Sequence, residues 1–225
     1  MKFSGIQKTS LVDYPSRVAA VLFTPGCNLR CPFCHNWRIV VDPKPPFLNE
    51  ETALEILKSR RKFVDAVVVT GGEPAMHRDL PKFLKRLRKE GFSVKLDTNG
   101  FYPGVLEECL AFVDYVSMDV KTSLEKYPLL GAGDVAPFQK TIRLLKEGRV
   151  PYEFRTTVVP SFVDADDIPK LGELVKDAAD FAFQQFVPND TLEKSYASRT
   201  PYSAEVIAGF ADTMRKYVNS VTLRV

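Results

Sequence analysis

Three cysteines stand close together in the run GCNLRCPFCHNW, which directly follows an apolar stretch. They are Cys27, Cys31 and Cys34, and the thiolate of each can bind one iron of a four-iron cluster. The fourth iron then has no protein ligand and is free to take a small molecule. The spacing therefore predicts an iron–sulfur site with one open iron, where a reaction can occur.

Two other uses of these thiols compete with the cluster. A zinc site would be closed by His35, but structural zinc sites usually pair cysteines two by two, and adjacent residues do not easily reach two corners of a tetrahedron. Disulfides suit an oxidising compartment, and the chain shows no secretory signal. The fourth cysteine, Cys109, cannot ligate a second cluster alone, and its helical surroundings favour a buried inert thiol.

A second polar motif, GGEP at Gly71, Gly72, Glu73 and Pro74, follows the apolar run AVVVT. Two glycines let the backbone come close to a ligand, and a carboxylate with exposed carbonyls can accept hydrogen bonds from an ammonium group. A simple tight turn is the alternative for this motif alone.

Charged and amide side chains end three further apolar runs. Asp97 and Asn99 belong to LDTNG, Asp119 and Lys121 to MDVK, and Arg155 to EFRTTVVP. Two carboxylates and a lysine at one sheet edge suit a ligand that carries a carboxylate and ribose hydroxyls, and a guanidinium can clamp a carboxylate bidentately. Turn residues and ordinary ion pairs, including a buried pair of Arg155 with Asp97 or Asp119, are the alternatives.

Short β-branched runs alternate with amphipathic stretches along the whole chain. The expected strands are Arg17–Phe23, Ala66–Thr70, Ser93–Asp97, Tyr115–Asp119, Glu153–Val159 and Phe181–Val187, with a possible last strand at Val221–Val225. The expected helices are Glu50–Phe63, Pro81–Glu90, Pro103–Phe112, Pro137–Glu147, Asp166–Ala179 and Ser203–Val218.

Nearly continuous apolar strands separated by helices indicate a parallel sheet in an α/β protein. The polar motifs follow the carboxyl ends of the strands, where such proteins assemble their active sites. Six units are too few for a full eight-unit barrel. We expect a partial (β/α)6 TIM-type barrel of parallel strands in a single domain, residues 1–225, and a flat doubly wound sheet is the alternative.

The overall composition excludes several classes of protein. The net charge of +3 is too small to indicate a nucleic-acid partner, and no apolar run is long enough to cross a bilayer. We expect a cytoplasmic protein without a nucleic-acid or membrane partner.

The spacing CxxxCxxC, with Phe33 before the last cysteine, resembles the signature of radical S-adenosylmethionine (SAM) enzymes. The order of the motifs KTSLVDYPSR, GGEP, LDTNG, MDVK and FRTTVVP is similar to that of the activating enzymes of glycyl radical proteins. The resemblance is strongest to the activating proteins of anaerobic ribonucleotide reductase, and it extends to those of pyruvate formate-lyase.

This resemblance implies a [4Fe-4S] cluster on the three cysteines and SAM on the open iron. It implies that the residues in contact with the cofactor are Phe33, Gly71, Gly72, Glu73, Asp97, Asn99, Asp119, Lys121, Arg155 and Gln185. Asp97 and Asp119 are expected to help to hold a monovalent cation. Gln184 or Gln185 stands where the formate-lyase activases have a histidine that contacts SAM.

The same resemblance implies a glycyl radical enzyme as protein substrate and a reductant such as flavodoxin or ferredoxin. Two other functions remain open from the sequence. One is a radical SAM enzyme that acts on a small molecule, as in deazapurine synthesis, and the other is a zinc-binding module.

Overall fold

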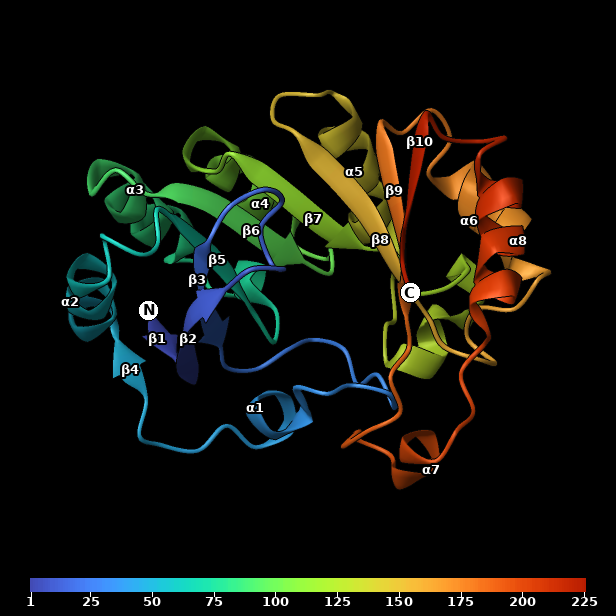
Figure 1. The fold of residues 1–225 in the computed structure, drawn as a ribbon, viewed down its shortest axis with the longest axis horizontal. Coiled ribbons are helices and arrows are strands. Elements are labelled where there is room, and N and C mark those ends of the chain that lie inside the picture. Colours follow the sequence, from blue (N-terminus) through green and yellow to red (C-terminus); the bar gives the residue numbers. More distant parts are fainter.

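The computed structural model describes residues 1–225 and contains one curved eight-stranded sheet (Figure 1). The strand order is β10-β9-β8-β7-β6-β5-β3-β2, and all neighbours are parallel except β2 and β3. The strands are β2 (Gly5–Ser10), β3 (Ala19–Thr24), β5 (Ala66–Gly71), β6 (Ser93–Thr98), β7 (Tyr115–Asp119), β8 (Tyr152–Val158), β9 (Asp180–Gln185) and β10 (Ser220–Arg224). The predicted α/β class and its parallel sheet are confirmed.

Helices cover the outer side of the curved sheet, and the concave side is left to the loops at the strand ends (Figure 1). The outer helices are α2 (Glu50–Ser59), α3 (Leu80–Lys89), α4 (Pro103–Cys109), α5 (Ala136–Lys146), α6 (Asp167–Leu174) and α8 (Ala204–Met214). Two short helices, α1 (Trp37–Val41) and α7 (Lys194–Ala197), lie beside the carboxyl ends of the strands. A small antiparallel pair joins β1 (Lys2–Phe3) to β4 (Leu48–Asn49).

Helix α3 shows how the sequence pattern produces this packing. Leu80, Phe83, Leu84 and Leu87 recur at helical spacing and are completely buried, whereas Lys82 on the opposite side is exposed. A 3.6-residue period gathers the four apolar side chains into one stripe that faces the sheet. The main hydrophobic core therefore lies between the sheet and its outer helices.

The inner face of the sheet is divided into an apolar part and a charged part. Val21 on β3 pairs with Val68 on β5, and both belong to a small apolar cluster. On the other strands the same face presents Lys95, Asp119 and Arg155, because paired residues in a parallel sheet share a face. This division places Lys95, Asp119 and Arg155 together inside the curved sheet.

The structure differs from the sequence prediction in strand β2 and at the end of helix α6. Strand β2 was not expected, since it is an edge strand with exposed polar residues and no apolar alternation. Helix α6 ends before the predicted Ala179, and Asp177 has a left-handed backbone with φ of 62°. No helix combines the length and the apolar character that a membrane span requires.

Candidate cluster and cofactor site

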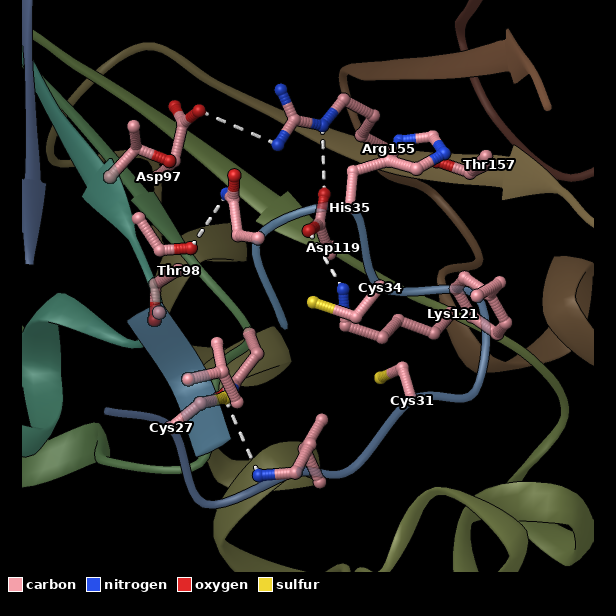
Figure 2. Close-up of a pocket in the computed structure, with 18 of the residues that line it drawn as sticks. Cys27, Cys31, Cys34, His35, Asp97, Thr98, Asp119, Lys121, Arg155 and Thr157 are labelled. Carbon is pink, nitrogen blue, oxygen red and sulfur yellow. Dashed lines mark hydrogen bonds and ion pairs between the residues drawn. The ribbon is translucent and has the colours of Figure 1, made fainter. Parts of the chain in front are cut away.

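The three cysteines of the CxxxCxxC motif line one cavity of about 440 Å³ at the carboxyl ends of the strands (Figure 2). They lie in the loop that follows β3. Backbone hydrogen bonds hold this loop, from the Gly26 amide to the Ile39 carbonyl at 2.7 Å and from the Cys34 amide to the Cys31 carbonyl at 3.1 Å. The loop therefore presents all three sulfurs to the same space.

No three histidine, cysteine or acidic side chains converge closely enough to hold a single metal ion. The His35 ring stacks on Phe186 with an interplanar angle of 5°, and its Nε2 is 2.9 Å from the Val187 carbonyl oxygen. The histidine of the zinc alternative is thus engaged by the segment after β9. Three thiols spread around one cavity suit a cluster, because each thiolate then binds its own iron.

One positive charge, the Lys121 ammonium, acts on all three thiols. Burial raises the pKa of the Cys31 thiol to about 12, and the Lys121 ammonium opposes that increase. Burial also raises the pKa of Cys27 and Cys34, and Lys121 again opposes it. The ammonium group therefore favours the thiolate form that a cluster needs. By donor chemistry and charge, the residues of this cavity fit a [4Fe-4S] cluster.

The two glycines of GGEP allow two backbones to meet. Gly71 has φ of +115°, and a Cβ at Gly72 would lie 1.7 Å from the Gly26 carbonyl oxygen. The Gly72 amide donates to the Thr24 carbonyl at 2.9 Å, and the Glu73 amide donates to the Gly26 carbonyl at 2.9 Å. Only glycine fits here, and the motif is thereby fastened to the start of the cysteine loop. Gly71 and Gly72 also line the cavity.

The Glu73 carboxylate is completely buried beneath the cavity and accepts three hydrogen bonds. Its oxygens receive the Ala75 amide at 2.9 Å, the Thr98 hydroxyl at 2.7 Å and the Asn99 amide at 2.6 Å. Burial raises the pKa of Glu73 to about 7, although the hydrogen bond from Asn99 and the others oppose this. In this structure Glu73 binds GGEP to the end of β6, and its expected contact with a cofactor amine stays a prediction.

Five charged side chains of β6, β8 and the end of β7 form a continuous row of alternating sign, and Figure 2 labels all of them except Lys95. We call it the charge row: Lys95, Asp97, Arg155, Asp119 and Lys121. The successive nitrogen–oxygen distances along it are 2.7, 3.5, 2.7 and 2.9 Å. The row begins with Lys95 beside the apolar part of the inner face and ends with Lys121 beside the cysteines.

Three members of the charge row, Asp119, Arg155 and Lys121, hold one another in the ionised form. Burial disfavours the charge on Asp119, but the Arg155 and Lys121 cations outweigh burial and keep the pKa of that carboxyl well below its usual range. Burial likewise opposes the charges on Lys121 and Arg155, and the neighbouring Asp119 raises the pKa of both. The row contains three positive and two negative groups, so it presents a positive end to an anionic ligand.

Asn99 and Phe33 complete the walls of the cavity. The Asn99 side chain donates to the Asn28 Oδ1 at 2.8 Å and to the Cys27 sulfur at 3.5 Å. The Phe33 ring meets the Phe162 ring edge to face, with 5.1 Å between centroids. Packing thus fixes the aromatic ring between Cys31 and Cys34.

Of the two glutamines that end β9, Gln184 lines the cavity and Gln185 does not. Gln184 pairs with Thr157 of β8, which lines the same cavity. The Gln185 amide donates to the carbonyls of Phe186 and Tyr202, both at 3.2 Å. The strand register therefore turns Gln184, not the predicted Gln185, toward the cysteines.

Sequence reasoning missed two residues of this region, Lys95 and Asp13. Lys95 is only 2% exposed, and its ammonium donates to Asp97 and to the Asp13 carbonyl, each at 2.7 Å. A charged residue two positions before Asp97 in an apolar strand was the available signal, because the two share a face. Asp13 comes from the β2–β3 connection, within the motif KTSLVDYPSR, and nothing in the sequence linked it to Lys95.

The fourth cysteine is remote from these groups. Cys109 ends α4, is completely buried in the main core and does not line the cavity. Burial raises the pKa of its thiol to about 12, so the thiol is neutral and unreactive at ordinary pH.

The chain is an α/β protein with three cysteines in an inner cavity at the carboxyl ends of a curved parallel sheet, an arrangement that suits an iron–sulfur cluster. The sequence profile of the Radical SAM superfamily matches residues 21–175, which include the cysteines and all of the charge row. The chain belongs to the radical SAM superfamily. Membership implies a [4Fe-4S] cluster and SAM.

Relatives by sequence lie among the glycyl-radical activating enzymes. A protein of Methanocaldococcus jannaschii, itself assigned by inference as a glycyl-radical enzyme activating enzyme, is 36% identical over 98% of this chain and 95% of its own length. The pyruvate formate-lyase-activating enzyme of Clostridium pasteurianum is 28% identical over 85% of this chain and 83% of its own. The Staphylococcus aureus enzyme of the same name is 30% identical over 76% of this chain and 74% of its own.

Solved structures share the fold at lower identity. QueE from Escherichia coli superposes with a TM-score of 0.62 at 17% identity, over 100% of this chain and 93% of that one. Streptococcus suis SuiB bound to the precursor peptide SuiA gives a TM-score of 0.68 at 16% identity, over 90% of this chain and 47% of that one. At such identities the likeness shows the fold alone, a curved sheet of the TIM-barrel type.

Proposed function

We propose that this chain is a radical SAM activase that generates a glycyl radical on a partner enzyme. The single observation that carries this proposal is the cavity in which three cysteines and the end of the charge row meet. The reported relatives by sequence, which match 76% to 98% of this chain, support the same activity. We further propose that residues 1–225 form one radical SAM core domain, and that the protein works in the cytoplasm.

In this proposal each side chain has a defined task. Cys27, Cys31 and Cys34 hold the cluster, and Lys121 and Arg155 receive the carboxylate or the ribose of SAM. When bound together, the cluster and SAM supply a one-electron reductive cleavage that yields a carbon-centred radical able to abstract hydrogen. The hydrogen bonds of Asn99 to Asn28 and to the Cys27 sulfur hold the cysteine loop in place.

Gly71 and Gly72 bring the carbonyls of the GGEP segment to the cavity, where they are the proposed acceptors for the SAM ammonium group. Phe33, Asp97, Asn99 and Gln184 are proposed to complete the contacts with the cofactor. Glu73 acts through the hydrogen bonds that fix these groups, and Gln185 supports the neighbouring loop. We propose no monovalent metal ion at this site, because the carboxylate oxygens of Asp97 and Asp119 already face ammonium and guanidinium groups.

We propose a glycine in anaerobic ribonucleotide reductase as the hydrogen donor, with flavodoxin or ferredoxin as the source of the electron. The order of motifs in the sequence supports this partner. Glycine suits such a reaction, because its backbone enters a narrow cavity without a side chain. The glutamine at Gln184, where formate-lyase activases carry histidine, favours this reductase over formate lyase.

The test mixes the reconstituted protein, SAM, a reductant and the candidate reductase without oxygen. A glycyl radical signal should appear by electron paramagnetic resonance, and deuterium at the Cα of the target glycine should move into 5′-deoxyadenosine. The Cys31→Ser variant is the control and should give neither result. Turnover of a small heterocyclic substrate without any protein partner would instead show that the chain is a small-molecule enzyme.

A further inference from the structure

The resemblance to formate-lyase activases implies that Asp97 and Asp119 help to hold a monovalent cation, but each oxygen of these two carboxylates already faces a positively charged side chain. Asp97 faces the Lys95 ammonium at 2.7 Å and the Arg155 guanidinium at 3.5 Å. Asp119 faces Arg155 at 2.7 Å and Lys121 at 2.9 Å. Each of the four carboxylate oxygens therefore already has a positive partner.

The balance of charge also disfavours an added cation. The charge row contains three cations and two carboxylates, so it is already positive by one. A further cation beside this row would meet net repulsion, which is stronger in a partly buried site than in bulk water. Without one of its three cations, the row would contain two positive and two negative groups.

Lys95 is the member of the row whose ammonium group is almost completely buried and is held by two oxygen atoms of the protein. Its side chain is 3% exposed, and its ammonium is held by the Asp97 Oδ1 and the Asp13 carbonyl oxygen, both at 2.7 Å. A carboxylate oxygen and a backbone carbonyl oxygen are the ligand types that hard cations prefer. The ammonium thus occupies a small nest of oxygen ligands.

The same contacts transmit the position of Lys95 to the rest of the site. Lys95 fixes Asp97 at the end of β6, and Asp97 in turn contacts the Arg155 guanidinium (Figure 2). The second contact of the Lys95 ammonium, with the Asp13 carbonyl oxygen, holds the β2–β3 connection beside Asp97. Lys95 is therefore a positioning residue for Arg155 as well as a source of charge.

We propose that the Lys95 ammonium is a built-in cation that takes the place of a bound monovalent metal ion, so that this chain binds SAM without sodium or potassium. The inference rests on the SAM site of the proposed function and is independent of the protein partner. SAM affinity is measured without any partner, so a failure of the glycyl-radical assay leaves this test unaffected.

The experiment measures SAM binding to the reconstituted protein by anaerobic equilibrium dialysis, in choline chloride and in sodium or potassium chloride at one ionic strength. For the unchanged protein the dissociation constant should differ by less than roughly twofold between the salts. Lys95→Ala opens the oxygen nest and should weaken binding by roughly tenfold or more in choline. Sodium or potassium should restore much of that loss.

Two further variants separate charge from packing. Lys95→Met keeps an unbranched stem in the nest, so it should bind SAM weakly in every salt and show no rescue. Lys82→Ala, which removes an exposed lysine of α3, should behave like the unchanged protein. The thermal midpoint of the reconstituted protein gives a second readout, which sodium should raise for Lys95→Ala and leave unchanged otherwise.

Two results would overturn the proposal. One is a SAM affinity of the unchanged protein that depends strongly on sodium or potassium. The other is a Lys95→Ala variant that binds SAM as well as the unchanged protein in choline. If Lys95→Ala does not fold, the proposal is still tested by the salt dependence of SAM binding to the unchanged protein and by the SAM affinity of Lys95→Met.

Discussion

The Asn99 side-chain nitrogen lies 3.5 Å from the sulfur of Cys27. Its orientation is fixed, because the Asn99 side-chain oxygen accepts from the Phe101 amide at 3.2 Å and its backbone amide donates to Glu73 at 2.6 Å. The N–H group therefore points at a sulfur that the proposal assigns to the cluster. Hydrogen bonds to ligand sulfurs are among the factors that set the potential of an iron–sulfur cluster.

Replacing Asn99 with leucine should lower the reduction potential of the cluster. The N–H group stabilises the more negative, reduced state, and a difference of about 1 kcal/mol corresponds to roughly 40 mV for one electron. The potential is measured by titration monitored by electron paramagnetic resonance, with iron content as a check. Asn28→Ala keeps the donor to sulfur and is the matched control. An unchanged potential in Asn99→Leu would refute this role.

The cysteines should separate into two groups. Serine at Cys31 removes a thiolate from the cavity, so the iron content and the reductive cleavage of SAM should collapse. Serine at Cys109 should leave both nearly intact, because that thiol is buried in α4 away from the cavity. Iron analysis after anaerobic reconstitution distinguishes the two. Full loss of iron in Cys109→Ser, with Cys31→Ser still loaded, would reverse the assignment.

Glu73 should make the stability of the protein depend on pH. Its pKa is raised from 4.5 to about 7 in the folded protein, chiefly by burial, so the folded state keeps a proton that the unfolded state loses. The stabilising contribution is complete below about pH 4.5 and is lost as pH rises through about 7, a change of about 2 to 4 kcal/mol.

The comparison with Glu73→Gln isolates this effect from that of the other carboxyls. The unfolding free energy of each protein is measured in denaturant under reducing conditions at about pH 5 and about pH 8. The unfolding free energy of the unchanged protein should exceed that of Glu73→Gln by a larger amount at the lower pH. An equal advantage at both values would mean that Glu73 is ionised throughout.

Arg155 should act on SAM and not on iron. Arg155→Ala leaves Asp97 and Asp119 without the cation that joins them. In a desolvated site this should weaken the free energy of SAM binding by about 2 to 5 kcal/mol. SAM affinity should fall while iron content stays the same. Arg149→Ala, which removes a half-exposed arginine paired with Glu147, is the control and should change neither. Normal SAM binding in Arg155→Ala would assign Arg155 a structural role.

Much of the fold could be predicted because its signals are local. The apolar strands and the stripe of α3 are written in neighbouring residues, and the polar motifs mark the strand ends. Strand β2 lacked such a signal, since its residues are mostly polar and its pairing with β3 closes an edge of the sheet. The cysteine spacing was equally local, and it led to the right superfamily.

What could not be predicted depends on contacts between distant residues. Lys95 meets Asp13 across 82 positions of sequence, and no local pattern links them. Glu73 turns inward because Thr98 and Asn99, supplied by another strand, donate to it. A strand pattern gives two faces without saying which one lines a cavity, and sheet register settles that choice.

The neighbouring glutamines at the end of β9 test that register directly. Gln184 lines the cavity, whereas the Gln185 amide donates to the carbonyls of Phe186 and Tyr202. Gln184→Ala should therefore weaken SAM binding and leave the thermal midpoint nearly unchanged. Gln185→Ala should cost about 1 to 2 kcal/mol of stability through two lost hydrogen bonds, with SAM affinity largely kept. Calorimetric titration with SAM and thermal unfolding of both variants provide the measurements. Loss of SAM binding in Gln185→Ala alone would restore the assignment that the sequence favoured.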